Sequence, residues 1–87
     1  MPRLFLPSIL CERGGGIDAP LEVEGGSVGA VFDAACERHP ALRRWVVDEA
    51  GHLRQHVKVF VNEREAGLDT SVEPADEVHV VPAISGG

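Results

Sequence analysis

The sequence contains no long hydrophobic run. Its first apolar segment, residues 4–6, is broken by Pro7 long before it could form a signal-peptide core or a membrane span. We therefore expect a cytoplasmic protein. Cysteine is also scarce, since Cys11 and Cys36 are the only two. In a cytoplasmic chain they are expected to be reduced, buried thiols and not a disulfide.

Positive charge is in short supply as well. Eight Lys and Arg residues against fourteen Asp and Glu residues leave a formal net charge of -6. This charge repels phosphate backbones and anionic lipid surfaces, so neither nucleic acid nor a membrane is expected as a partner. It would suit a partner with a basic docking face, or it would serve only to keep the protein soluble.

The residue types that build active sites form no recognisable set. No P-loop pattern and no Ser, His and Asp triad can be assembled. His52 and His56 stand four residues apart, but no cysteine or third ligand accompanies them, so a metal site is not predicted. Asp48 and Glu49 fit a solvated loop pair better than a general acid and base. We expect a protein that is not an enzyme and binds no cofactor of its own.

A chain of 87 residues with 44% apolar and 25% charged residues is typical of one soluble globular domain. It is too short for a substrate cleft between two domains, and it contains no internal repeat or linker. We therefore expect a single domain over residues 1–87, of which residues 82–87 form a flexible C-terminal tail.

The first half of the chain predicts a β-hairpin and a helix. Residues 3–11 are apolar or β-compatible, the glycines at 14–16 can reverse the chain, and residues 20–24 alternate as a second strand. Ser27 is a suitable N-cap for a helix over residues 27–39, which Pro40 ends. A second short helix is predicted from residue 42 to about residues 48–51, with Trp45 at the edge of the core.

The second half predicts two more strands. Residues 57–61 are a dense β-branched run, followed by a turn at 62–63 and a loop over 67–74 that could include one helical turn. Residues 77–81 form the last strand, and Pro82 ends its hydrogen bonding. Hairpin, helix and two strands are the order of an α+β, ubiquitin-like β-grasp, in which a mixed sheet of four or five strands packs on one main helix.

The last residues are the most specific feature. Gly86 and Gly87 follow a short arm of Pro82, Ala83, Ile84 and Ser85. Because neither glycine has a Cβ atom, such a tail could thread a narrow channel in a partner enzyme. A frayed tail without function is the alternative, since chain ends are usually loose.

With this ending, the sequence resembles the sulfur carriers related to ThiS, MoaD and CysO. The resemblance covers nearly the whole chain and also includes residues 59–63 and 76–78, although Ala75 stands where many of the family have glycine. It implies that an E1-like adenylating enzyme of the ThiF or MoeB type, using ATP and Mg, activates the carboxylate of Gly87. It also implies a thiocarboxylate at Gly87 that donates sulfur to a biosynthetic acceptor enzyme, such as a cysteine synthase-like enzyme.

Alternation along the strands also predicts a docking surface. If Leu4, Val59 and Val78 face the helix, then Phe5, Phe60 and Val81 point away from it. We expect these three, together with the arm over residues 82–85, to bind the partner enzymes. The alternative is that loops cover one or more of them.

Three other functions are possible for a chain that ends in this way. The glycine-rich first turn and the Pro-led arm resemble the cysteine-synthesis carriers more than the small subunit of molybdopterin synthase, which remains an alternative. A ubiquitin-like modifier conjugated through Gly87 is another, although Lys58 as the only lysine gives few sites for chains of the protein on itself. A plain interaction domain without tail chemistry is the third.

Overall fold

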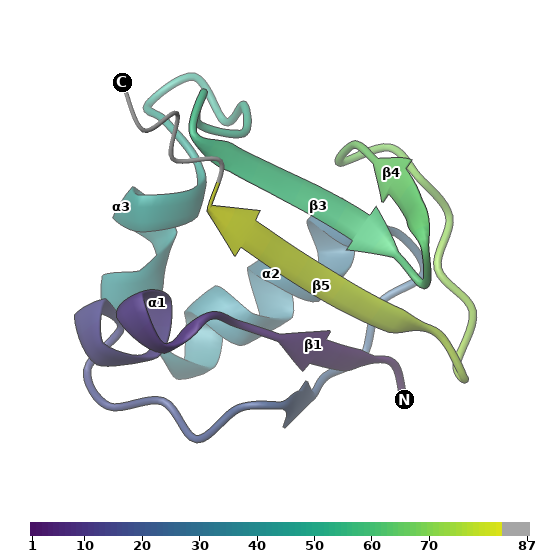
Figure 1. Ribbon diagram of the computed structural model, residues 1–87, viewed down its shortest axis with the longest axis horizontal. Coiled ribbons are helices and arrows are strands. Elements are labelled where there is room, and N and C mark those ends of the chain that lie inside the picture. The colour runs from purple at the N-terminus through teal and green to yellow at the C-terminus, as the bar shows by residue number, and fades with distance from the viewer. Residues whose placement is uncertain (83–87) are drawn as a thin grey trace.

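The structure, a computed structural model that describes residues 1–82, is a mixed sheet with its longest helix on one face (Figure 1). The strands are β1 (Arg3–Phe5), β2 (Leu21–Glu22), β3 (Val57–Val61), β4 (Arg64–Ala66) and β5 (Glu77–Pro82). The helices are α1 (Ser8–Arg13), α2 (Val28–Arg38), the 3-10 turn η1 (Pro40–Leu42) and α3 (Arg43–Val46). The predicted α+β, β-grasp fold is confirmed.

The sheet has the strand order β2-β1-β5-β3-β4. Strand β5 lies in the middle, parallel to β1 and antiparallel to β3. The first strand and the last strand of the described chain, β1 and β5, are therefore neighbours in the sheet. Helix α2 crosses behind the sheet in the view of Figure 1. Leu4, Val59 and Val78 come from the three central strands and are fully buried on the helix side.

The long helix forms because its apolar stripe has a core to pack on. The buried residues of α2 are Val28, Val31, Phe32, Ala35 and Cys36. Phe32 is 3% exposed, whereas Trp45 is partly buried at the core edge, as predicted for both. Burial raises the pKa of the Cys36 thiol, so that it stays protonated near neutral pH.

The first N–H groups of α2 all find acceptors. The Ser27 hydroxyl accepts from the N–H of Ala30 at 3.1 Å, which confirms the predicted cap. The N–H groups of Val28 and Gly29 donate to the carbonyls of Thr70 and Leu68. The loop after β4 contains no helical turn. Its carbonyl groups instead hold the start of α2 in place.

The predicted first strand over residues 3–11 is wrong beyond Phe5. Ser8–Arg13 is the helix α1, whose first turn is closed by N–H groups of Leu10 and Cys11 donating to the Pro7 carbonyl at 3.0 and 3.1 Å. Proline is tolerated before a helix because its missing N–H would have no partner there. Strands β1 and β2 do pair antiparallel, but a helix and not a tight turn joins them.

Strand β4 was not predicted. It follows a tight turn at Asn62, which has φ of 57°, and pairs back on β3. The Asn62 side chain also accepts from the N–H of Glu77 at 3.1 Å and donates to Asp76 at 3.1 Å. The N–H of Glu73 donates to Asp76 as well, and these bonds hold the pKa of Asp76 below its usual value. The turn is thereby tied to the start of β5.

Pro82 is the last residue of β5 and does not lie beyond it, which corrects the predicted strand end at residue 81. It pairs with Val57 of β3, while β1 reaches along β5 only as far as His79. With a strand neighbour on one side only, a residue without an N–H group is tolerated in the sheet.

Candidate functional site

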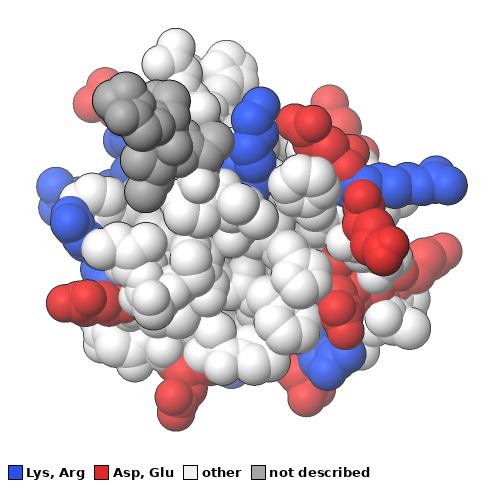
Figure 2. Space-filling model, viewed as in Figure 1, with Lys and Arg blue, Asp and Glu red and all other residues white. Residues whose placement is uncertain are grey.

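The face of the sheet that points away from α2 carries a row of side chains without Asp, Glu, Lys or Arg. We call it the outward row and define it as Phe5 on β1, Phe60 on β3, and His79 and Val81 on β5. These positions alternate with the buried residues of their strands. Figure 2 shows this face as a largely uncharged surface framed by charged side chains.

His79 lies at the centre of the outward row. Its ring stacks on Phe5 with 4.4 Å between ring centroids and 7° between ring planes. On its other side it is the register partner of Phe60. The three rings therefore form one strip across β1, β5 and β3. Stacked aromatic side chains bury large apolar areas at little cost in side-chain entropy, which suits a contact surface.

Val81 extends the row toward the end of β5. It is 42% exposed and is one of the few large apolar residues exposed to this extent. Its register partner is Lys58, whose ammonium group pairs with Glu65 at 3.4 Å. A partner protein that covered Val81 would thus also meet a charged pair at its edge.

Ion pairs border the row at its other end. Arg3 donates to Glu77 at 2.6 Å, and the second oxygen of Glu77 lies 3.1 Å from His79 Nε2. The Arg3 guanidinium also lies 5.6 Å from the centre of the Phe5 ring. Exposed pairs of this kind add little stability, but they fix where charge stands beside the rings.

The structure thus places Phe5, Phe60 and Val81 on one face, with Pro82 next to Val81 at the end of the strand. Their role in binding stays a prediction. Ala83, Ile84, Ser85, Gly86 and Gly87, the rest of the predicted site, lie outside the described residues. The row and the predicted reactive end are therefore adjacent along the chain, with only the predicted arm between them.

Sequence reasoning missed His79 as part of this surface. The signal was present, since the alternation that puts Val78 and Val80 inside must put His79 outside with Val81. Its place between the two phenylalanines follows from the sheet order, which brings β1 and β3 to either side of β5. Sequence spacing alone does not fix that order.

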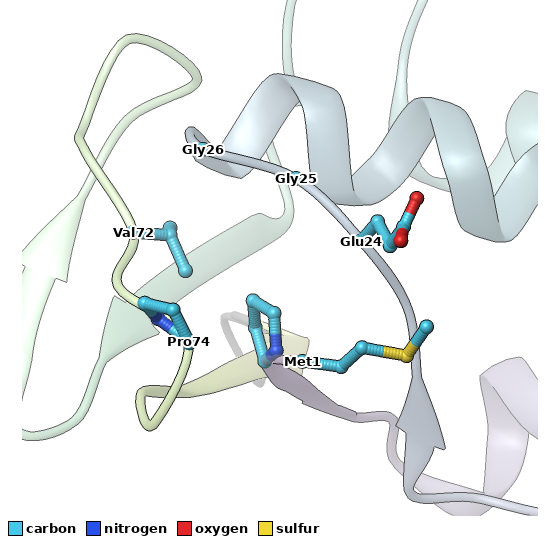
Figure 3. A pocket seen from close by; sticks show the side chains of 7 residues that line it. Met1, Glu24, Gly25, Gly26, Val72 and Pro74 are labelled. Carbon is cyan, nitrogen blue, oxygen red and sulfur yellow. The ribbon is translucent and has the colours of Figure 1, made fainter.

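A shallow pocket of about 370 Å³ lies at the opposite end of the sheet (Figure 3). It is lined by Met1, Pro2, Glu24, Gly25, Gly26, Val72 and Pro74. A single carboxylate among apolar and backbone groups supplies no acid and base pair and no nucleophile. The pocket is also near the start of β5, about 20 Å along that strand from Pro82.

Residues 1–82 contain no group of three or more His, Cys, Asp or Glu side chains placed to hold a metal ion. Within the same residues no helix has the length and apolarity required to cross a membrane.

Comparison with known proteins agrees with this picture. The ThiS family matches residues 13–87. Small archaeal modifier protein 1 of Haloferax volcanii is 34% identical over 79 residues, which span 90% of this chain and 91% of that protein. The sulfur carrier protein CysO of Mycobacterium tuberculosis is 27% identical over 88 residues, with 94% of each chain covered.

A solved structure gives the same relationship. A chain of the Amycolatopsis orientalis BexX/CysO complex superposes with a TM-score of 0.87 at 27% identity, covering 100% of both chains. The relatives named here are small carrier or modifier proteins, and neither name describes an enzyme. From its sequence match and its β-grasp sheet, this chain belongs to the ThiS family of ubiquitin-like sulfur carriers and modifiers.

Proposed function

We propose that this chain is a sulfur carrier whose working group is the C-terminal carboxylate of Gly87. The observation that carries the proposal is the ThiS-family match, which runs through Gly86 and Gly87. The likeness to CysO, a protein named as a sulfur carrier, supports it over nearly the whole length of both chains. A carrier of this kind is a cosubstrate, and its chemistry takes place in the sites of partner enzymes.

The proposed reaction begins with activation. A carboxylate oxygen of Gly87 attacks the α-phosphorus of ATP, held with Mg in an E1-like enzyme, and pyrophosphate leaves. A sulfide-level sulfur nucleophile then attacks the carbonyl carbon of the acyl adenylate, forming a C–S bond as AMP departs with the C–O bond electrons. The resulting thiocarboxylate is a sulfur nucleophile that an acceptor enzyme can use. Two residues without a Cβ atom, Gly86 and Gly87, would let the chain end enter both sites.

The outward row is the proposed docking surface for these enzymes. Its rings and Val81 offer an apolar contact, and residues 82–85 would lead from it into the partner's site. The charged pairs at its rim would fix orientation more than they add affinity.

A second candidate function is conjugation to other proteins. It is favoured by the 34% identity to Small archaeal modifier protein 1. The first step would be the same, but a lysine amine of a target protein would displace AMP and leave an amide at Gly87. A third candidate, the small subunit of molybdopterin synthase, would make the chain a permanent subunit and would be recognised by co-purification of a large subunit.

Activation is tested by ATP–pyrophosphate exchange with the ThiF-type enzyme of the same organism. We expect exchange to depend on this chain and to disappear when Gly87 is deleted, because the deletion changes the residue that must fit the adenylating site. The core of the described residues is built from residues 4 to 80, so thermal unfolding is the control and should be unchanged by the deletion. Equal exchange with and without Gly87 would contradict the proposal in all its forms.

A further inference from the structure

A second surface, unrelated to the outward row, stands out by its charge. In Figure 2, several basic side chains appear along the edge that holds α1 and α3, with a few acidic ones among them, while acidic side chains are more numerous on the opposite side around β4. In a protein with a net charge of -6 such a basic edge is unexpected. We define the Arg–Trp patch as Arg13 on α1, Arg44 and Trp45 on α3, and Arg54 in the segment before β3.

Trp45 organises the patch. The guanidinium of Arg13 lies 4.6 Å from the centre of the Trp45 ring, and that of Arg44 lies 5.3 Å from it. The indole is partly buried against the core, which fixes its position. Cation–π contacts therefore hold two guanidinium groups beside a rigid ring while their N–H edges stay available to a third molecule.

Arg54 belongs to the same surface because its Nε donates to the Arg44 carbonyl at 2.6 Å. Among residues 1–82, no carboxylate forms an ion pair with Arg13, Arg44 or Arg54. The neighbouring Arg43 differs, since it pairs with Asp33 at 3.3 Å. The patch thus presents three cations without acidic partners in the described part of the chain.

Acidic residues do occur close by. Asp48 and Glu49 line an open cavity of about 520 Å³ together with Arg43, Arg44 and Arg54. One oxygen of Asp48 accepts the N–H groups of His52 and Ala50 at 2.9 Å each, and these bonds, together with the nearby charge of Arg54, lower the pKa of that carboxyl. Asp48 therefore stays ionised at neutral pH and offsets part of this charge, but the three guanidinium groups of the patch still outnumber the two carboxylates that line the cavity.

The patch stands beside the point from which the reactive end of the chain starts. Pro82 pairs with Val57, and the Val57 N–H donates to the Arg54 carbonyl at 3.0 Å. The Arg54 N–H in turn donates to the carbonyl of Val46, the residue after Trp45, at 3.0 Å. Any enzyme that takes up residues 83–87 must come close to this surface.

We propose that the Arg–Trp patch docks on a carboxylate-bearing surface of the activating enzyme, close to the entrance of the channel for the C-terminus. The inference rests on the proposed function. Activation precedes both sulfur transfer and conjugation, so the activating enzyme is the partner common to both. Arg and Trp are the side chains most enriched among residues that dominate binding energy. A polyanion is a poor alternative, because the net charge of the protein repels it.

The test removes two exposed charges that lie outside the buried core. Arg13→Gln with Arg44→Gln should raise the KM of the activating enzyme for this protein about tenfold or more and leave kcat nearly unchanged. The matched control, Arg38→Gln with Arg64→Gln, removes the same charge elsewhere and should change KM much less. The double variant Arg13→Lys with Arg44→Lys should fall between, because lysine keeps the charge but not the flat guanidinium.

A spectroscopic readout locates the contact. Trp45 is the only tryptophan, so the 15N-labelled protein gives one indole N–H signal. This signal should shift on adding unlabelled activating enzyme, and raising the salt concentration should weaken binding of the wild type more than binding of the Gln variant.

Two results would overturn the inference. Equal KM values for the patch variant and its control would show that the patch does not meet the activating enzyme. Normal activation with impaired sulfur transfer would assign the patch to the acceptor instead. If the wild type is not adenylated at all, the proposed function fails first, and that result is distinct from both.

Discussion

Gly25 should not tolerate even an alanine. It lies just before the cap of α2, where the chain passes close to the first turn of the helix (Figure 3). An added Cβ atom would lie 2.6 Å from the Val31 nitrogen and 2.9 Å from the Ala30 carbonyl carbon. These are backbone atoms that cannot rotate away, and the Val31 N–H already donates to Ser27 at 2.9 Å. The helix start or the preceding strand would have to move.

Overpacking of this kind costs about 1–3 kcal/mol, and we expect the upper part of that range because backbone atoms are involved. For a domain of this size the melting temperature should fall by roughly 10–20 °C. The neighbouring Gly26 is the control. An alanine Cβ there meets nothing within 4 Å, so Gly26→Ala should be neutral or stabilising by about 0.4–1 kcal/mol.

Urea unfolding of the two variants decides the matter. We expect a clearly lower midpoint for Gly25→Ala and an unchanged or higher midpoint for Gly26→Ala, with similar slopes. Equal stability of the two variants would mean that α2 does not begin against this segment. The account of how the helix is held under the sheet would then be wrong.

Three further predictions concern the docking surface, the core and the turn before β5. Val81→Asp should weaken binding to the activating or acceptor enzyme. Thermal unfolding should stay nearly unchanged, because the new carboxylate is exposed and lies opposite Lys58. The control variant Ala19→Asp, in an exposed loop, should bind normally. Phe32→Ala should cost about 3–5 kcal/mol in urea unfolding, and a loss under 1 kcal/mol would contradict its place in the core. The wild type should be more stable than Asp76→Asn, and the difference in the free energy of unfolding should be full above pH about 4. The difference should shrink as the pH falls through the lowered pKa of Asp76 in the folded state, because the carboxylate is then protonated. A difference that grows in acid would contradict this.

The helix α2 and strands β3 and β5 were predictable because each carries a strong local pattern. Ser27 caps the helix, and its apolar residues repeat at helical spacing against the core. Residues 57–61 and 77–81 are β-branched runs that alternate between the two faces. In these segments local preference and tertiary packing agree.

The errors fell where the local pattern is ambiguous or absent. Residues 8–11 are compatible with a strand as well as with a helix, and the helix that forms buries Leu10. Strand β4 is a three-residue edge strand with Ala66 as its single apolar residue, so hydrophobic alternation could not reveal it. The Arg–Trp patch was not predicted because Arg13 and Trp45 are distant in sequence and meet only through the packing of α1 beside α3.

The central claim is that Gly87 becomes a thiocarboxylate, and the mass of the intact protein tests it most directly. The protein is incubated with the ThiF-type enzyme, ATP, Mg and a sulfide source, and its mass is then compared with that of the Gly87 deletion treated alike. We predict a mass gain equal to the exchange of one oxygen for one sulfur in the wild type and none in the deletion, because only the end of the tail reacts. An unchanged wild-type mass, or covalent linkage to lysines of other proteins as the only product, would contradict the claim.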